Sequence, residues 1–302
     1  MDITTLAECL NNEKIKYSLS SPMSLLTSFK IGGPADILIE PSKKEEIIRS
    51  IELCHSKNVP ITIIGKGSNL LVSDDGIEGA VIKVAGGLDE IKLVDENTVV
   101  CGAGASLSSL CTFAQSYGLS GLEFAYGIPG SVGGAVYMNA GAYGGEMKDV
   151  VASVTYLTAD GIEQRVSFDE IDFGYRKSFF SGKDYIILSA TFSLSLDDKK
   201  AINDRMNDFI NRRKEKQPLS FPSGGSTFKR PPDNFAGALI EKSGLKGFSI
   251  GGAQVSEKHA GFVINKGDAT CEDVLALMAH IVKTVKEQHG VTLEPEIIKI
   301  GR

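Results

Sequence analysis

The spacing of apolar positions predicts a strand, a helix and a second strand near the N-terminus. Two short, mainly apolar runs are typical of strands: Asp36-Ile37-Leu38-Ile39-Glu40 and Ile61–Ile64. Between them, Ser42-Lys43-Lys44-Glu45 matches a capping box, which is the signature of a helix start. The residues that follow place four apolar side chains on one helical face: Ile47, Ile48, Ile51 and Cys54. This region therefore predicts a small β-α-β unit.

From about Val81 to Leu196 the apolar spacing changes to one that favours strands. A turn is expected at Asp160-Gly161, and one helix is expected at Ser106–Tyr117, with Gly118 at its end. The expected strands are 91–94, 98–101, 150–158 and 185–196.

After this strand-rich region the pattern returns to helices. One helix is expected to start at Asp197 or Asp198 and to stop before Gln217-Pro218. Its basic last turns are typical of a solvated helix end, which is one interpretation of Arg213 and Lys214. Further on, the pattern predicts a short helix from Phe235, a strand at 262–265, and a long helix that begins at 270–273 and ends at Gly290.

Composition and charge exclude several classes of protein. The chain has 302 residues and a net charge of −6, which argues against a nucleic-acid or membrane-surface protein. Five cysteines stand far apart, without the spacing of a zinc site or a disulfide framework: Cys9, Cys54, Cys101, Cys111 and Cys271. No apolar run has the length of a membrane span, and no signal segment opens the sequence. We therefore expect a cytoplasmic protein with no metal site and no membrane or nucleic-acid partner.

Glycine-rich runs carry the strongest chemical signal. They lie at Gly65–Val72, Gly127–Gly134 and Asn139–Gly144. Consecutive main-chain N–H groups can cradle a diphosphate without a charged side chain, and two such loops suggest a large dinucleotide. Neither the three-glycine Rossmann fingerprint nor a nucleotide-hydrolysing phosphate loop is present. The runs therefore indicate a dinucleotide site of another kind.

Six motifs in order resemble the UDP-N-acetylenolpyruvoylglucosamine reductase family over essentially the whole chain, in the shorter branch of that family. The motifs are Thr27–Asp36, Gly65–Leu71, Gly127–Gly134, Tyr175–Ser178, Gly225–Lys229 and Leu293–Ile297. The resemblance implies an α+β protein with the FAD-binding fold of the vanillyl-alcohol-oxidase/PCMH type. Two FAD-binding subdomains are then expected at residues 1–74 and 75–196. An α+β substrate-binding domain is expected at 197–302, with its C-terminal strand returning to the active site.

The same resemblance implies a reaction in peptidoglycan precursor synthesis. NADPH would reduce a non-covalently bound FAD, and the enolpyruvyl group of UDP-N-acetylglucosamine enolpyruvate would then be reduced to give UDP-N-acetylmuramate. No protein partner is required. Two alternatives stay open: an FAD-dependent oxidase or dehydrogenase of a different small alcohol or lactone, and a non-catalytic flavin sensor.

The resemblance assigns three catalytic residues. Arg176 would grip the substrate carboxylate, on which negative charge develops, because a guanidinium stays charged and can form two parallel hydrogen bonds. Ser226 would protonate the neighbouring carbon, and Glu296 would help to stabilise the intermediate. The sequence by itself also fits simpler roles. Arg176 can form a surface ion pair with Asp172 or Asp184, Ser226 can be a turn residue, and Glu296 can lie at a strand edge.

Binding residues are also implied. The expected cofactor-binding residues are Ile64, Gly65, Lys66, Gly67, Ser68, Asn69, Leu70, Gly127, Ile128, Pro129, Gly130, Ser131, Gly133, Gly134, Asn139 and Gly141. The expected substrate-binding residues are Tyr175, Arg212, Lys216, Lys229, Arg230 and His259. The chain differs from the longer branch of the family because the link at 179–183 leaves no room for the insertion that carries a lid tyrosine. Arg230 stands where many relatives have asparagine.

Overall fold

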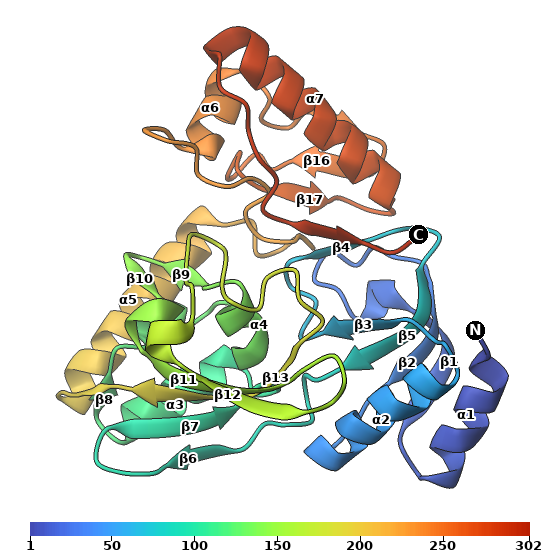
Figure 1. Cartoon of the computed structure of the whole chain (residues 1–302). Coiled ribbons are helices and arrows are strands. Elements are labelled where there is room, and N and C mark those ends of the chain that lie inside the picture. The colour runs from blue at the N-terminus through green and yellow to red at the C-terminus, as the bar shows by residue number, and fades with distance from the viewer. The chain divides into compact units, whose positions relative to one another are not determined.

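The computed structural model describes all 302 residues and divides them into two compact units, each assembled from separate stretches of the chain (Figure 1). The first unit contains residues 1–19, 37–66 and 79–213, and the second contains residues 20–36, 67–78 and 214–302. The roles expected for 1–74, 75–196 and 197–302 stay predictions.

A four-stranded sheet has the order β1-β2-β5-β3, with β1 at Tyr17–Pro22, β2 at Pro34–Ile39, β5 at Ile77–Lys83 and β3 at Ile61–Ile64. Helices α1 (Ile3–Asn12) and α2 (Lys44–Ser56) belong to the same region. The strand-helix-strand prediction is confirmed, although β5 lies between the two predicted strands and pairs in parallel with β3.

The predicted capping box at 42–45 is wrong by one residue. The N-cap of α2 is Lys43, and it makes no side-chain cap. Ser42 instead donates from its main-chain N–H and its hydroxyl to the Glu46 carboxylate, at 2.8 and 3.0 Å. The sequence motif identified the helix start but chose the wrong acidic partner.

A five-stranded antiparallel sheet forms the larger part of the first unit, in the order β12-β11-β13-β7-β6. Its strands are β12 (Glu163–Ser167), β11 (Val151–Leu157), β13 (Ile186–Ser193), β7 (Thr98–Gly102) and β6 (Ile91–Leu93). Helix α3 (Leu107–Ser116) is capped by the Ser106 side chain and followed by Gly118, which confirms the prediction.

A second helix in this region was not predicted. Helix α4 (Val132–Tyr137) starts inside the glycine run, with Ser131 as its N-cap. Gly133 lies so close to Ala103 that a Cβ would fall 2.9 Å from the Ala103 Cβ. Tertiary packing therefore outweighs the low helix propensity of two consecutive glycines.

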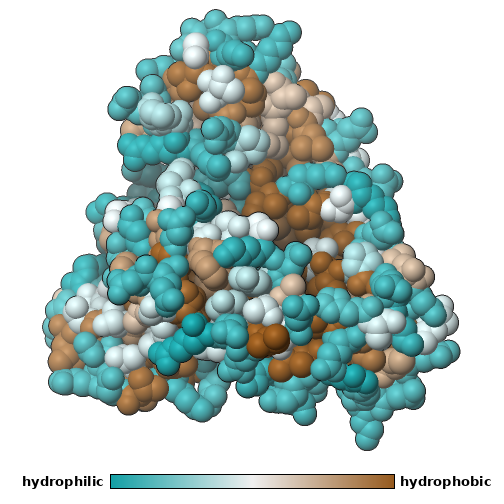
Figure 2. All heavy atoms as spheres, in the orientation of Figure 1, coloured by the Kyte–Doolittle hydropathy of each residue, from teal (hydrophilic) through white to brown (hydrophobic).

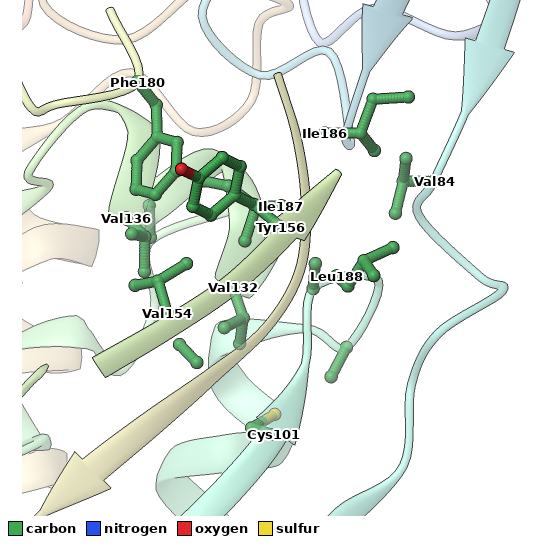
Figure 3. Close-up of a cluster of buried hydrophobic side chains, with 14 of the residues drawn as sticks. Val84, Cys101, Val132, Val136, Val154, Tyr156, Phe180, Ile186, Ile187 and Leu188 are labelled. Carbon is green, nitrogen blue, oxygen red and sulfur yellow. The ribbon is translucent and has the colours of Figure 1, made fainter. Parts of the chain in front are cut away.

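The core of the first unit joins this sheet to α4. In Figure 3, Val132 and Val136 of α4 lie beside Val154 of β11, with Tyr156 and Phe180 close by. The Tyr156 and Phe180 rings meet edge to face, with centroids 5.4 Å apart and planes at 75°. This packing holds α4, the helix that starts inside the second glycine run, in place.

Helix α5 and several short elements complete the first unit. Helix α5 (Lys199–Lys216) has the predicted extent, and its last three residues belong to the second unit. The short strands are β8 (Leu119–Ser120), β9 (Gly141–Ala142), β10 (Gly145–Glu146) and β14 (Ser195–Leu196). Three single 3₁₀ turns lie at Glu123–Ala125, Met147–Asp149 and Phe168–Glu170, and a fourth, Met23–Leu25, belongs to the second unit.

The second unit packs helices against a small sheet. Its elements are α6 (Ala236–Lys242), α7 (Cys271–His289), the antiparallel strands β15 (Ser249–Ile250), β16 (Ala253–Val255) and β17 (Val263–Asn265), and the parallel pair β4 (Leu70–Val72) and β18 (Ile298–Ile300). Thr270 and Asp273 form the predicted capping box of α7, and Gly290 ends this helix at φ 69°. Asp74 accepts hydrogen bonds from the N–H groups of Cys271 and Glu272, which anchors the same helix start.

Hydrophilic residues cover much of the visible face of each unit, with apolar residues between them (Figure 2). None of the helices combines the length and the apolar composition needed to cross a bilayer.

Candidate functional site

The first glycine loop follows β3 directly and keeps a row of main-chain donors available. The N–H groups of Gly65, Lys66, Gly67 and Ser68 donate no hydrogen bond to another group of the chain. Four consecutive N–H groups without an acceptor in the chain are what an anion cradle requires, and the cradle itself stays a prediction. The loop is therefore suited to a negatively charged group such as a diphosphate.

The first unit brings Gly65, where the first glycine loop begins, close to the second loop. A Cβ on Gly65 would overlap the Oγ atom of Ser131, so a larger residue would force that hydroxyl to rotate away. Ser131 is buried, and its Oγ also accepts from the Gly134 N–H at 3.4 Å. The start of α4 thus lies directly beside Gly65, where the first loop begins.

Neighbouring main chain holds the second loop in place. The Gly130 carbonyl accepts from the Leu107 N–H at 3.1 Å, and the Ala105 carbonyl accepts from the Val132 N–H at 2.9 Å. Gly127 has φ 90°, and a Cβ there would overlap the Ile210 side chain of α5. Helix α5 therefore packs directly against the loop, which restricts its movement.

Arg213, near the end of α5, reinforces this contact. Its guanidinium donates to the Gly127 carbonyl, and its Nε atom is buried without a hydrogen-bond partner. Burial lowers the pKa of Arg213. The interpretation of Arg213 as part of a solvated helix end is therefore wrong, because the side chain packs inward on the glycine loop. A helical pattern alone could not distinguish this position from the exposed Arg212.

A second arginine of α5 holds the segment that precedes the loop. Arg205 lies 2.7 Å from the buried Glu123 carboxylate and also bonds to the Ser120 hydroxyl and to Asp197. Because Glu123 begins the 3₁₀ turn at 123–125, α5 holds the chain at two points around Gly127. Nothing in the sequence predicted this ion pair.

Asn139 connects the end of the second loop to the turn that carries Arg176. Its side-chain amide donates to Glu146 at 2.8 Å and to the Gly174 carbonyl at 2.9 Å, and its carbonyl oxygen accepts from the Lys148 N–H at 3.0 Å. Asn139 is fully buried and has φ 42°. Its side chain is thus engaged by protein groups on every side.

Arg176 occupies a strained position in a tight turn. Gly174 and Lys177 exchange hydrogen bonds across the turn, and Arg176 between them has φ 54°. Such a conformation is costly for a residue with a Cβ and is often found at functional positions. The guanidinium donates to the Gly141 carbonyl at 3.3 Å and lies 5.0 Å from the Tyr175 ring centroid. Asp172, one of the two carboxylates that the sequence offers for a surface pair with Arg176, forms an ion pair with Lys177 at 3.0 Å.

In the second unit, the segments of Ser226 and Glu296 are hydrogen-bonded neighbours. The Glu296 N–H donates to the Thr227 carbonyl at 2.9 Å, and the Lys229 N–H donates to the Glu294 carbonyl at 2.8 Å. Phe228 and Pro295 form the antiparallel bridge between these two bonds. Two residues that are 70 positions apart in sequence are thereby held on adjacent extended segments.

Comparison with known proteins places these features in a family. Residues 35–167 match the family model described as an FAD binding domain, and residues 217–300 match the one described as the C-terminal domain of UDP-N-acetylenolpyruvoylglucosamine reductase. A UDP-N-acetylenolpyruvoylglucosamine reductase from Clostridium perfringens (strain SM101) is 49% identical over 297 residues, which are 98% of this chain and 96% of its own.

The chain belongs to the UDP-N-acetylenolpyruvoylglucosamine reductase family. The crystal structure of such a reductase from Thermus caldophilus is similar, with a TM-score of 0.79 and 36% identity, over 94% of this chain and 98% of that one. A second structure, Physcomitrella patens BBE-like 1, shares the fold at 14% identity, with a TM-score of 0.50 over 64% of this chain and 45% of its own. The predicted FAD-binding fold is confirmed.

The glycine loops fit the FAD expected of this reductase family. The free N–H groups of the first loop and the close approach of Gly65 to Ser131 are consistent with a dinucleotide cradle. No group of three metal-ligating side chains is present. Burial raises the pKa of the Cys54 and Cys101 thiols to about 12, which keeps both protonated at neutral pH.

The remaining residues that the resemblance assigns to the substrate have varied surroundings. Arg212 and Lys216 lie on the exposed face of α5, where Arg212 pairs with Asp208. Lys229 pairs with Glu294 at 3.3 Å, and the Arg230 guanidinium lies 4.0 Å from the Phe235 ring centroid. Most of these cations are therefore on the surface and already have a protein contact.

His259 is the most enclosed of the expected substrate residues. Burial lowers its pKa, so the imidazole is mostly neutral at pH 7. Its Nδ1 atom accepts from the Gly261 N–H at 3.1 Å, which places the proton of the neutral ring on Nε2. The Gly261 carbonyl in turn accepts from the Thr227 N–H. Gly261 therefore connects His259 to the segment that contains Ser226.

Proposed function

We propose that this protein is an FAD-dependent reductase that uses NADPH to reduce the enolpyruvyl group of UDP-N-acetylglucosamine enolpyruvate, giving UDP-N-acetylmuramate for peptidoglycan synthesis. Full-length similarity to reductases of this name supports the substrate. The structural observation that carries the proposal is the direct hydrogen bonding between the Ser226 and Glu296 segments. A proton donor and a stabilising carboxylate must act at one reacting group, and this pairing supports that requirement.

FAD, when bound, accepts a hydride from NADPH and delivers a hydride to the substrate. The chain would hold it without a covalent bond, through the two glycine loops, because neither loop contains a histidine or cysteine. Gly65–Ser68 would bind the diphosphate through main-chain N–H groups, and Ser131 at the start of α4 would approach the same group.

Arg176 would bind the carboxylate of the enolpyruvyl group. Negative charge grows on that carboxylate as the double bond is reduced, so a fixed cation there lowers the barrier. The turn between Gly174 and Lys177, held by Asn139, limits the movement of the arginine main chain. A rigid placement is what electrostatic stabilisation requires, since no reorganisation is then needed during the reaction.

Ser226 would donate the proton to the carbon next to the carboxylate, and Glu296 would stabilise the intermediate. A serine hydroxyl is a weak acid, so it serves as a donor only to a strongly basic carbon in a site shielded from water. The buried Thr227 beside Ser226 is held at its N–H by Gly261 and at its hydroxyl by the Val263 N–H, at 2.8 Å. These bonds would keep the serine in place.

The cationic residues would bind the substrate diphosphate. Arg212, Lys216, Lys229 and Arg230 supply the charge, and Tyr175 and His259 would contact the rest of the nucleotide sugar. Lys229 and Arg212 would exchange their carboxylate partners for phosphate. Since the nucleotide sugar and NADPH are metabolites of the cytoplasm, we place the activity there, with no protein partner.

This function can be tested by measuring the flavin absorbance during each of the two half-reactions under anaerobic conditions. NADPH should bleach the flavin band of the purified protein, and the enolpyruvyl sugar nucleotide should restore it. Ser226→Ala should keep the bleaching step and slow the recovery by roughly 10²- to 10⁴-fold, the usual contribution of a positioned acid. Ser116→Ala, an exposed serine at the end of α3, is the matched control and should behave as the parent protein.

Other outcomes distinguish the alternatives. Recovery of the flavin band that needs oxygen and an alcohol would support an oxidase instead. Equal loss of both half-reactions in Ser226→Ala would contradict the assigned role of the serine, and no effect on either would support a flavin sensor.

A further inference from the structure

Asn69 of the first glycine loop is hydrogen-bonded to the segment that carries Glu296. Its side-chain amide donates to the Glu296 carbonyl at 3.1 Å, and its main-chain carbonyl accepts from the Ile298 N–H at 2.9 Å. Immediately afterwards β4 pairs in parallel with β18, with Leu70 opposite Ile298, and the two strands run side by side in Figure 1. The loop and the Glu296 segment are thus one hydrogen-bonded structure within the second unit.

The main chain of Glu296 is held from two directions. Its N–H donates to the Thr227 carbonyl, next to Ser226, while its carbonyl accepts from the Asn69 amide. The preceding residue, Pro295, has no N–H to contribute, so Glu296 supplies the N–H that bonds to Thr227. The following residue, Ile297, is buried in the core of the second unit. Little freedom is left to the Glu296 main chain.

We propose that Asn69 is a positioning residue that sets the place of the Glu296 carboxylate through this bond to the Glu296 main chain. The inference rests on the proposed function, in which Glu296 acts on the reacting group. It assigns to the Asn69 side chain a role beyond contact with the cofactor. Its consequence is that the loop expected to bind FAD also sets the position of a residue expected to act on the substrate.

Chemistry at this position explains why an asparagine is needed. Aspartate has the same shape but carries no N–H donor when ionised, and its charge would repel the Glu296 carbonyl. Loss of the bond would let the Glu296 segment shift, and a displacement of about 1 Å at a catalytic group can cost roughly 100-fold in rate. Hydride transfer from NADPH needs no proton donor, so the first half-reaction does not depend on this placement.

The test compares Asn69→Asp with the parent protein at saturating FAD. We expect recovery with the enolpyruvyl sugar nucleotide to slow by roughly 10- to 100-fold more than flavin reduction by NADPH does. Hydrogen exchange of the peptide 294–300 should become faster, which is a readout independent of activity. Asn69→Ala removes the amide without adding charge and should slow the same half-reaction.

Asn97→Asp is the matched control. The Asn97 side chain also donates to a remote main-chain carbonyl, that of Leu194, at 3.0 Å, in a turn without any predicted site residue. The Asn97→Asp variant should leave the rates of both half-reactions unchanged. Thermal unfolding of each variant checks that the fold is intact.

Three results would overturn the inference. They are recovery at the parental rate in both Asn69 variants, equal slowing of both half-reactions at saturating FAD, or unchanged hydrogen exchange at 294–300. Failure of the proposed function looks different, because the parent protein itself would then show no recovery with the sugar nucleotide.

Discussion

Arg205 of α5 and Glu123 form an ion pair of 2.7 Å in which the glutamate side chain is only 8% exposed. Glu123 also accepts from the Ser120 hydroxyl and from the Gly121 N–H, at 2.8 and 2.7 Å. Its carboxylate is therefore surrounded by donors at the point where the chain turns toward Gly127. The pair fixes the approach to the second glycine loop.

This environment predicts a loss of stability in acid. Burial by itself would raise the pKa of Glu123, but Arg205 and the main-chain donors outweigh it and lower the pKa below its usual value of 4.5. A lowered pKa means that the stabilisation is present above about pH 4.5 and is lost as the pH falls through the lower, folded-state pKa. Urea unfolding at pH 7 and near pH 3 measures the effect.

Variants of the pair sharpen this prediction. Arg205→Ala should cost about 1–3 kcal/mol of unfolding free energy at pH 7, because it leaves a buried carboxylate unpaired while the arginine itself is partly exposed. Glu123→Gln should show a weaker dependence on pH between 3 and 7 than the parent protein. Glu52→Gln, in the exposed pair with Arg49, is the control and should have almost no effect. An unchanged acid dependence in Glu123→Gln would contradict the assignment.

Gly65→Ala should weaken FAD binding without unfolding the protein. The added Cβ would overlap the Ser131 Oγ atom, so that hydroxyl would have to rotate away from its place at the start of α4. Flavin content after purification and near-ultraviolet circular dichroism measure the two effects. Gly174→Ala is the control, because its Cβ would meet only Lys177 at 3.7 Å and its φ is not positive. Full flavin content in Gly65→Ala would show that the loops are not jointly required.

Arg213→Gln should weaken FAD binding by roughly tenfold, the effect of losing about one charge-assisted hydrogen bond. In this variant no guanidinium donates to the Gly127 carbonyl, so the second loop is more mobile in the FAD-free protein. FAD binding must then restrict this motion, which costs binding free energy. Titration of the unbound form of each protein with FAD, followed by flavin fluorescence, gives the dissociation constants. Lys200→Gln, on the exposed start of the same helix, should retain the parental constant. Equal constants for Arg213→Gln and the parent would exclude this role.

Denaturation should release intact FAD. The Cys54, Cys101 and Cys111 thiols are buried, with raised pKa values, and no cysteine or histidine lies in either loop. Acid precipitation should therefore leave all of the flavin in the supernatant, and the mass of the denatured chain should equal that of the sequence. A mass increase equal to that of a flavin would contradict this. The FAD-bound protein should also unfold at a higher temperature than the FAD-free form, because a ligand that binds only the folded state stabilises it.

Local signals in the sequence predicted several elements well. Thr270 and Asp273 set the start of α7, and Gly290 sets its end, because each acts on main chain a few residues away. Ser106 does the same for α3. Such signals need no knowledge of the rest of the fold, which explains why helix boundaries were predicted more accurately than the contents of the glycine runs.

Features that depend on distant residues could not be predicted in this way. Helix α4 forms in a glycine run because Gly133 packs on Ala103, and the inward turn of Arg213 depends on Gly127. The two compact units likewise combine separate stretches of the chain, and a pattern read along the sequence does not reveal such an arrangement. The candidate catalytic residues came from family resemblance, and the segments of Ser226 and Glu296 become neighbours through long-range hydrogen bonds such as that of Glu296 to Thr227.

The bond between Asn69 and Glu296 can form only late in the synthesis of the polypeptide. The two residues are 227 positions apart, so at roughly 5–20 residues per second a ribosome needs about 10–45 s to synthesise the second after the first. Throughout that interval β4 has no β18 to pair with, and its edge is open to other chains. Assembly of this loop is therefore among the last events of biosynthesis, and a prematurely terminated chain would carry an unpaired, aggregation-prone edge strand.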